Sequence, residues 1–244
     1  VHYEAAGNGI GATLASVSLG AVGRTFNIEN STTAADLTVT GAVTGAGLLT
    51  KSGTGTVLLN GPVAGAASVV AGALGGTGNV AGAVNVGSVG TLTPGGAVIG
   101  TFATGALTFA ANATYADDIN FVARTSDKVT VTGNFSLDGT NTTVLSITDL
   151  NPIGQFTFFS LPIVDYSGSW NGGLFTVGGV VIDDYDAATP NASTKFFVGP
   201  NRYAIDYNFN SGHTVALISI PEPGSLALLA GGVALLGGLR RRRG

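Results

Sequence analysis

The sequence predicts an all-β protein: a parallel β-solenoid, then an aromatic-rich β region, then one short apolar helix at the C-terminus. Glycine makes up 39 of the 244 residues and charged residues only 10%, a composition that favours strands and turns over long helices. Apolar and β-branched residues alternate with polar ones in many short segments, which is the period of a strand with one buried face. The last two dozen residues differ from all that precede them, because they hold an uncharged apolar run and then four arginines.

The solenoid is predicted over residues 1–114, where short strands are separated by glycine turns. A strand of this length cannot bury its apolar face alone, but repeated strands can do so when successive coils stack. The predicted strands are 26–28, 37–40, 54–59, 68–70, 84–86, 91–93 and 106–109. Glycine-rich turns recur between them at short and irregular spacing, at 45–47, 53–55, 75–78 and 94–96.

Part of this region resembles a known repeat. The stretch 25–114 contains Leu49-Thr50-Lys51-Ser52-Gly53-Thr54-Gly55-Thr56. These residues resemble the autotransporter-associated β-strand repeat, whose most recognisable piece is Leu-Thr-Lys-x-Gly-x-Gly-Thr. The resemblance implies a right-handed parallel β-helix, as in the passenger domains of secreted bacterial proteins.

Residues 115–219 are predicted to form a C-terminal β region that caps the last coil. Aromatic side chains concentrate here, and bulkier side chains indicate a wider core or a cap, which the end of a solenoid needs. The boundary is predicted between residues 112 and 118. The predicted strands are longer than before, at 128–132, 142–148, 155–161, 174–182, 195–198, 203–208 and 214–219.

The tail, residues 220–244, is predicted to be a marginal membrane anchor. The apolar helix is predicted over 224–239, and its fifteen residues from Ser225 to Leu239 make roughly 22 Å of helix, short of the ~30 Å hydrocarbon core. A buried core helix is the alternative for a run of this length, but the arginines that end it argue against that. The four arginines would stay on the cytoplasmic side, because basic residues that flank a membrane span resist translocation. This places residues 1–220 outside the cytoplasm.

The parts of this tail and their order resemble a bacterial sorting signal. Pro221, Glu222 and Pro223 keep the chain extended, and Arg240, Arg241, Arg242 and Arg243 follow the apolar run. Together they resemble the PEP-CTERM signal of Gram-negative envelope proteins. The resemblance implies two partners, which are exosortase, a membrane-embedded cysteine protease, and membrane lipid through the helix. It also implies an inner-membrane-anchored precursor whose body then reaches the cell surface or the extracellular space.

The charge of the body excludes one class of partner. Residues 1–220 carry six basic and thirteen acidic residues, a net charge of −7, against −4 for the whole chain. An acidic body without a basic patch is a poor binder of nucleic acid. The chain also has no cysteine, so it offers neither disulfides nor thiolate chemistry.

Two groups of acids are the candidates for chemistry: Asp117 with Asp118, and Asp183 with Asp184 and Asp186. Paired carboxylates serve glycoside hydrolysis, and clusters of oxygen ligands bind calcium. Adjacent strand residues point to opposite faces, however, so neither pair converges if it lies in a strand. We expect solvated loop acids, with a calcium site at the second group as the alternative.

Catalysis has little other support in the sequence. His2 and His213 are the only histidines, and no Gly-x-Ser-x-Gly turn is present for a serine nucleophile. The stretch 76–81 fits a dinucleotide-binding pattern formally, but no helix and no suitable acid follow it, so we expect a turn there. We therefore expect no catalytic residue, no metal ligand and no cofactor, and a protein that is not an enzyme.

The sequence leaves three functions open. The first is an exported structural protein of the cell surface or extracellular matrix. The second is a β-helix that binds or cleaves extracellular polysaccharide, in which Trp170 and Tyr185 would stack on sugar rings. The third is an adhesin, which would differ from the first only in having a partner.

Overall fold

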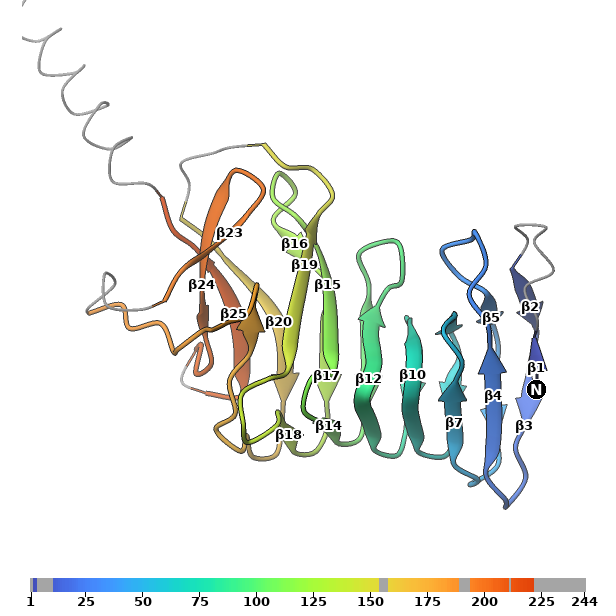
Figure 1. Cartoon of the computed structure of the whole chain (residues 1–244). Helices are drawn as coiled ribbons and strands as arrows, with labels where there is room; N and C mark the ends of the chain where they lie inside the picture. The colour runs from blue at the N-terminus through green and yellow to red at the C-terminus, as the bar shows by residue number, and fades with distance from the viewer. Residues whose placement is uncertain (1, 4–10, 154–157, 189–193, 211, 222–244) are drawn as a thin grey trace, which may run out of the picture.

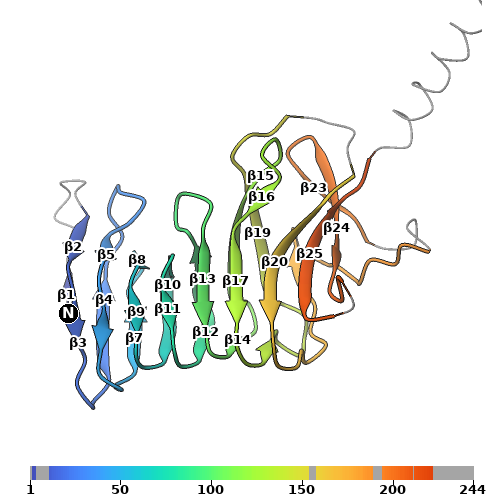
Figure 2. The same ribbon diagram turned by 180° about the vertical axis from the view of Figure 1, so that it is seen from behind.

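The computed structural model describes residues 2–3, 11–153, 158–188, 194–210 and 212–221. Every regular element in these ranges is a β-strand, and most strands pair in parallel with a strand one coil away along the chain. Figure 1 shows these coils side by side, from the first coil in blue to the C-terminal strands in orange and red, and Figure 2 shows them from behind. The predicted all-β fold with parallel strands is confirmed. The right-handed sense of the coil stays a prediction.

Three parallel faces run along the stack. The first face contains β2 (Ala12–Leu14), β5 (Leu37–Val39), β8 (Thr56–Leu59), the second halves of β10 (Ala67–Gly76) and β12 (Val84–Pro94), β15 (Thr114–Asn120), β19 (Val144–Asp149) and β21 (Thr176–Val177). The second face contains β3 (Val17–Ser18), β6 (Val43–Thr44), β9 (Pro62–Val63), β11 (Asn79–Val80), β13 (Thr101–Thr104), β17 (Lys128–Val131) and β20 (Ser160–Tyr166). The third face contains β1 (His2–Tyr3), β4 (Arg24–Ile28), β7 (Leu49–Ser52), the first halves of β10 and β12, β14 (Leu107–Phe109) and β18 (Phe135–Ser136).

Strands β10 and β12 turn a corner of the coil without losing their pairing. Their common ladder runs from Ala67 opposite Val84 to Gly76 opposite Pro94, with one register shift on the way. Gly72 lies in the bend at φ +69°, a left-handed conformation that favours glycine. The prediction of two separate strands at 84–86 and 91–93 is therefore wrong, because both segments belong to β12.

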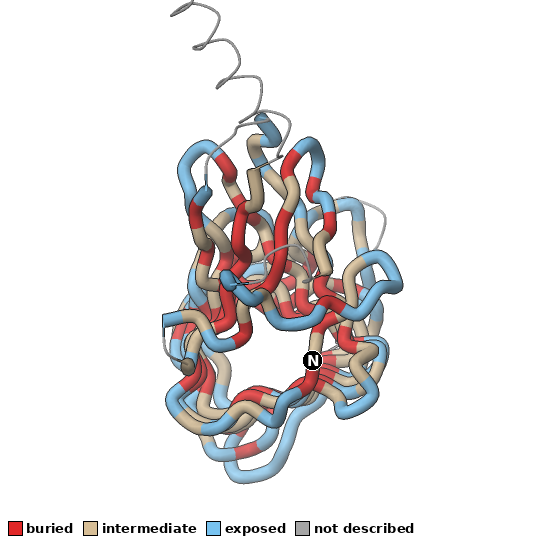
Figure 3. Tube along the Cα trace, turned by 90° about the vertical axis from the view of Figure 1, so that its left-hand side faces the viewer, coloured by how far each residue is buried: buried red, intermediate tan, exposed pale blue. Residues whose placement is uncertain are grey.

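The core is a set of stacked columns of buried side chains. One column of the first face consists of residues that lie opposite one another on successive coils, and all of them are buried: Leu37, Val57, Leu74, Leu92, Tyr115 and Leu145. On the third face 17 residues separate Ala67 from its partner Val84, whereas 28 separate Leu107 from Phe135. The C-terminal coils bury Phe109, Tyr115, Phe121 and Phe135. Viewed along the stack, the coils follow one outline on which buried and exposed positions alternate (Figure 3).

An antiparallel sheet closes the C-terminal end of the second face. Beyond β20 lie β25 (Thr214–Ser219), β24 (Asn201–Asp206) and β23 (Phe196–Val198), each antiparallel to its neighbour. The parallel sheets themselves run on past residue 114 through β15, β17, β19 and β20. The division into domains at 114/115 stays a prediction, although the aromatic-rich strands do lie at this end of the stack.

Two short hairpins complete the fold. Strand β16 (Thr125–Ser126) turns back on β15, and β22 (Val180–Val181) turns back on β21. The single strand predicted over 174–182 is wrong, because Gly178 and Gly179 both take positive φ angles, of 57° and 82°. Two successive residues of positive φ form the tight turn that best suits a two-residue hairpin.

Candidate functional site

The described chain ends where the predicted sorting residues begin. Strand β25 lies between β20 and β24, and Ser219 donates its N–H to the carbonyl of Phe159 at 2.9 Å. Ile220 donates its N–H to the carbonyl of Arg202 at 2.8 Å. Pro221 follows at once, half-buried, and its ring nitrogen cannot continue the ladder.

The rest of the predicted signal lies outside the described residues. This applies to Glu222, Pro223, the apolar run 224–239 and the arginines 240–243. No helix within the described ranges has the length and apolarity needed to cross a membrane. Just before the motif, β25 buries Val215, Ala216, Leu217 and Ile218 in the C-terminal antiparallel sheet, which we call the cap.

Lys51, in the repeat-like segment, is buried in the core of the third face. It is 1% exposed and lies in register with Phe26 on one side and Val69 on the other. Its Nζ donates to the carbonyls of Ser52 and Gly53 at 2.8 Å and of Ala71 at 3.1 Å. Burial lowers the pKa of Lys51 to about 8, and the nearby carboxylate of Asp36 opposes that shift. The ammonium group therefore joins two coils at a corner.

Asp36 is a second buried charge at this corner. Its carboxylate accepts the N–H groups of Ser31 and Thr56, both at 2.7 Å. These bonds fix the loop before β5 to the start of β8 on the next coil. Neither Lys51 nor Asp36 was predicted as a functional residue. Lys51 lies two residues after Leu49, however, and residues two apart in a strand point to the same face, so its inward position follows from the sequence.

The first predicted acidic pair is not a pair of solvated loop acids. Asp117 lies in β15, is 1% exposed and points inward, whereas Asp118 is half-buried, as alternation along a strand requires. Neither carboxylate oxygen of Asp117 has a hydrogen-bond partner. Burial, and then the carboxylates of Asp127 and Asp118, raise the pKa of Asp117 well above its usual range.

Asp127 completes this buried group, and the sequence did not predict it. Its Oδ1 accepts the N–H of Gly100 at 2.7 Å and its Oδ2 accepts the N–H of Asp118 at 3.2 Å. Burial raises the pKa of Asp127 to about 7, although these two N–H groups favour the charged form. Asp127 therefore attaches the loop before β13 to β15.

The second acidic group is divided among separate loop contacts. Asp183 accepts the N–H of Thr194, Asp186 that of Ala188, and Asp184 that of Tyr207. In the part of the chain that the structure describes, no three carboxylates or histidines are grouped so that they could hold a metal ion. The three acids of the calcium alternative, Asp183, Asp184 and Asp186, thus each accept a hydrogen bond from a different backbone segment.

Of the two residues predicted to stack on sugars, Trp170 packs its ring against another aromatic side chain. The indole of Trp170 lies parallel to the ring of Tyr207, 5.1 Å away, and its Nε1 donates to the carbonyl of Gly173 at 3.0 Å. Tyr185 is half-buried and donates its N–H to Ile205. His213 lies in a turn at φ +68° with its ring 5.3 Å from that of Tyr166, and His2 lies in β1.

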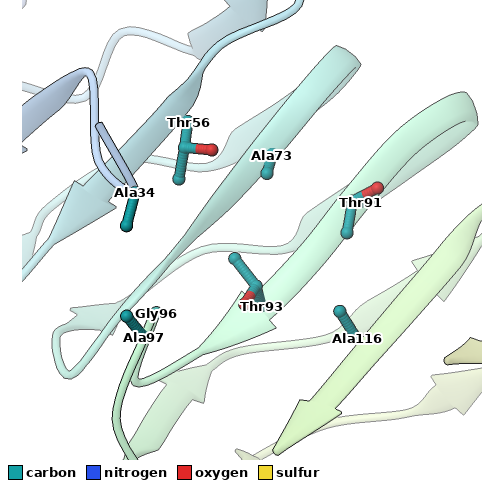
Figure 4. A pocket seen from close by; sticks show the side chains of 8 residues that line it. All are labelled: Ala34, Thr56, Ala73, Thr91, Thr93, Gly96, Ala97 and Ala116. Atoms are coloured by element: carbon teal, nitrogen blue, oxygen red, sulfur yellow. The ribbon is translucent and has the colours of Figure 1, made fainter. Parts of the chain in front are cut away.

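A shallow groove of about 220 Å³ lies on the outer side of the first face. Figure 4 shows Thr56, Ala73, Thr91 and Ala116 on successive strands as its floor. Ala34 and the loop at Gly96 and Ala97 stand at its edges (Figure 4). Its lining has no charged and no aromatic side chain, so it offers a ligand only hydroxyl and methyl groups.

Comparison with known proteins addresses the C-terminal motif alone. No curated protein matches the chain. Residues 219–243 match the family described as the PEP-CTERM protein-sorting motif, which begins at the last residue of β25. The chain therefore carries the sorting signal of a secreted or cell-envelope-associated protein that is processed by exosortase.

Proposed function

We propose that this chain is a non-enzymatic structural protein of the cell surface or extracellular matrix, held first by its tail in the inner membrane and then released by exosortase at Pro221-Glu222-Pro223. The observation that carries the proposal is the direct passage from β25 into the motif. Ile220 still donates to Arg202, and the next residue is Pro221. A cut within or after the motif leaves every described strand in place.

The buried polar groups support a structural role. Lys51 and Asp36 use their side chains to join neighbouring coils, and Asp127 attaches a loop to β15. None of these groups faces a solvent-filled cleft, because Lys51, Asp36 and Asp127 are each at most 1% exposed. They serve to hold the stack together in a chain without disulfides.

Replacing Pro221, Glu222 and Pro223 together by alanine tests the sorting step. In a host that contains exosortase, the variant is expected to accumulate at full length in the membrane fraction, while the wild-type chain loses its tail. The wild-type chain in a host without exosortase is the matched control and should resemble the variant. Gel mobility and fractionation measure both, and equal processing of variant and wild type would contradict the proposal.

Polysaccharide binding is the second candidate function, and an outer ladder of the third face favours it. Six polar residues lie opposite one another on successive coils and alternate with the buried columns: Thr25, Thr50, Ser68, Asn85, Thr108 and Ser136. Strands repeat every ~4.8 Å, so this face presents hydroxyl and amide groups at regular intervals. A polymer of regularly spaced hydroxyl groups is the partner that such a face suits.

Replacing Asn85 and Thr108 by leucine tests this second candidate. The double variant is expected to bind the host's purified extracellular polysaccharide about fivefold more weakly or worse, because each lost hydrogen bond is worth about 0.5–1.5 kcal/mol. Affinity electrophoresis measures the effect. Thr91→Leu, on the first face, is the control and should bind as the wild type does. Unchanged binding in the double variant would exclude the ladder.

A further inference from the structure

Four side chains form a row across the outer face of the cap, at the point where the chain leaves it. The antiparallel register places Phe197 opposite Arg202. The same registers, continued by one or two residues, place Arg202 opposite Ile220 and Ile220 opposite Phe158. We call Phe197, Arg202, Ile220 and Phe158 the exit row, and Pro221 follows it directly.

The exit row contains both of the exposed phenylalanines among the described residues. Phe158 is 59% exposed and Phe197 is 61% exposed. Their chain neighbours Phe159 and Phe196 point inward, where each packs against another aromatic ring of the cap. Alternation along the strands thus turns one phenylalanine of each pair outward, onto the side where the sorting motif begins.

Two loops extend this apolar surface. The turn between β15 and β16 carries the exposed Val122, and the loop after β19 carries the exposed Leu150 and Ile153. Asn201 at the β23–β24 turn donates its Nδ2 to the carbonyl of Ile153 at 3.3 Å, so this loop lies against the cap. Figures 1 and 2 show both loops and the β23–β24 turn at the end of the cap from which the chain departs.

Two arginines and one aspartate of the folded body lie beside this surface. Arg202 belongs to the exit row, and the guanidinium of Arg124 lies 5.7 Å from the ring centre of Phe159. The nearby Asp149 turns one oxygen to the N–H groups of Phe121 and Asn151. Exposed aromatic and aliphatic side chains with arginines beside them suit the boundary between lipid headgroups and acyl chains.

The tail brings this surface to the membrane. Only four residue steps separate Ile220 from Gly224, where the apolar run begins, and extended chain spans at most ~3.6 Å per step, so the two lie within about 14 Å. The headgroup layer on each side of the hydrocarbon is itself about 5–8 Å thick. The exit row therefore cannot stand far from the lipid while the tail is inserted.

We propose that the exit row, together with Val122, Arg124, Leu150 and Ile153, rests on the lipid surface of the anchored precursor, and we call these eight residues the exit surface. This inference rests on the proposed function, because it requires the tail in the membrane. The contact would set the height and orientation of Pro221-Glu222-Pro223 above the bilayer. It is small enough to be reversible, so that release still follows the loss of the tail.

The absence of cysteine allows a direct test on the full chain. Phe158→Cys, Phe197→Cys and Val22→Cys are labelled singly with an environment-sensitive fluorophore and reconstituted into vesicles of phosphatidylethanolamine and phosphatidylglycerol. Val22, 67% exposed on the first coil, is the matched control. Labels at 158 and 197 are expected to shift to shorter wavelength and to be quenched by lipid spin-labelled near the headgroup, while the label at 22 behaves as in water.

The other outcomes separate the two proposals. Labels at 158 and 197 that behave like the label at 22, on a chain that floats with the vesicles, overturn the exit surface and leave the anchor intact. A chain that does not float with the vesicles overturns both. A shift that persists in detergent and grows with protein concentration assigns the surface to a second copy, and one that requires exosortase assigns it to the protease. Either result overturns the lipid contact.

Independent support comes from removing the apolar side chains. With a label at Val122→Cys, the Phe158→Ser, Phe197→Ser chain is expected to lose most of the quenching by spin-labelled lipid that the otherwise wild-type chain shows. Circular dichroism checks that the variant keeps its β-structure. Undiminished quenching in a folded variant would contradict a role for the two phenylalanines.

Discussion

Raising the pH from about 5 to about 8 is expected to destabilise the folded chain by about 2–4 kcal/mol, because the native state retains a proton on a buried acid that the unfolded chain has lost. The pKa of Asp127 rises from 3.8 to about 7 on folding, and burial also raises that of Asp117 well above its usual range. Between the unfolded and folded pKa values the native state binds more protons, so stability present at low pH is lost as the pH rises. Denaturation by urea at several pH values measures this loss.

Asp138 and Lys51 act outside this window. The threonine hydroxyls and N–H groups around Asp138 lower its pKa despite the opposing effect of burial, so its contribution is lost only when the pH falls below the ordinary range of a carboxyl. Lys51, with a pKa lowered to about 8, gives a slope of the opposite sign only at higher pH. Burial also raises the pKa of the half-buried Asp118 and Asp206, so these two acids add to the slope that Asp117 and Asp127 produce.

Asp117→Leu isolates the unpartnered carboxyl. The side chains are similar in shape, and the change removes a buried group that has no hydrogen bond, so the variant is expected to equal or exceed the wild type in stability at pH 8 and to show a shallower slope. Glu29→Gln, which removes an exposed carboxyl, is the control and should keep most of the wild-type slope. Parallel slopes for Asp117→Leu and wild type would contradict the assignment.

The sequence predicted the class of the fold because its signal is local. Period-two alternation fixes which side chains point inward on each short strand, and residues such as Val57 and Leu92 are buried as that pattern requires. The corners could not be predicted in the same way. Whether a strand ends or only bends at Gly72 depends on whether its backbone can keep pairing with β12. That pairing is made by residues of the next coil, which a local pattern does not include.

The buried acids were mispredicted for a related reason. Aspartate is rare in strands, so Asp117 and Asp118 concealed the strand that contains them. Once β15 is known, Tyr115, Asp117 and Ile119 follow as its inward residues by alternation. Asp127 carried no local signal at all, because its two partners are the backbone of Gly100 and Asp118. The sorting motif, by contrast, is continuous in sequence and could be recognised without the fold.

Lys51→Met is expected to cost about 3–5 kcal/mol of unfolding free energy, because it leaves three carbonyls at a buried corner without their donor. Methionine keeps most of the volume of the side chain, so the loss reports the ammonium group more than a cavity. Gly72 packs closely against the same corner, since a Cβ there would lie 2.5 Å from the carbonyl oxygens of Gly53 and Gly55. Urea denaturation at pH 7 measures the change.

Lys128→Met is the matched control, because it removes the same group from a surface. Lys128 pairs with Asp165 at 3.0 Å, and the two side chains are 34% and 36% exposed. A solvated pair of this kind contributes at most about 1 kcal/mol, so the control should remain close to the wild type. Comparable losses of unfolding free energy in the two variants would show that the burial of Lys51 adds nothing to its contribution to stability. A much larger loss for Lys51→Met would instead show that the lysine of the repeat-like segment joins one coil to the next. Any chain that repeats this segment would need such a lysine at each corner.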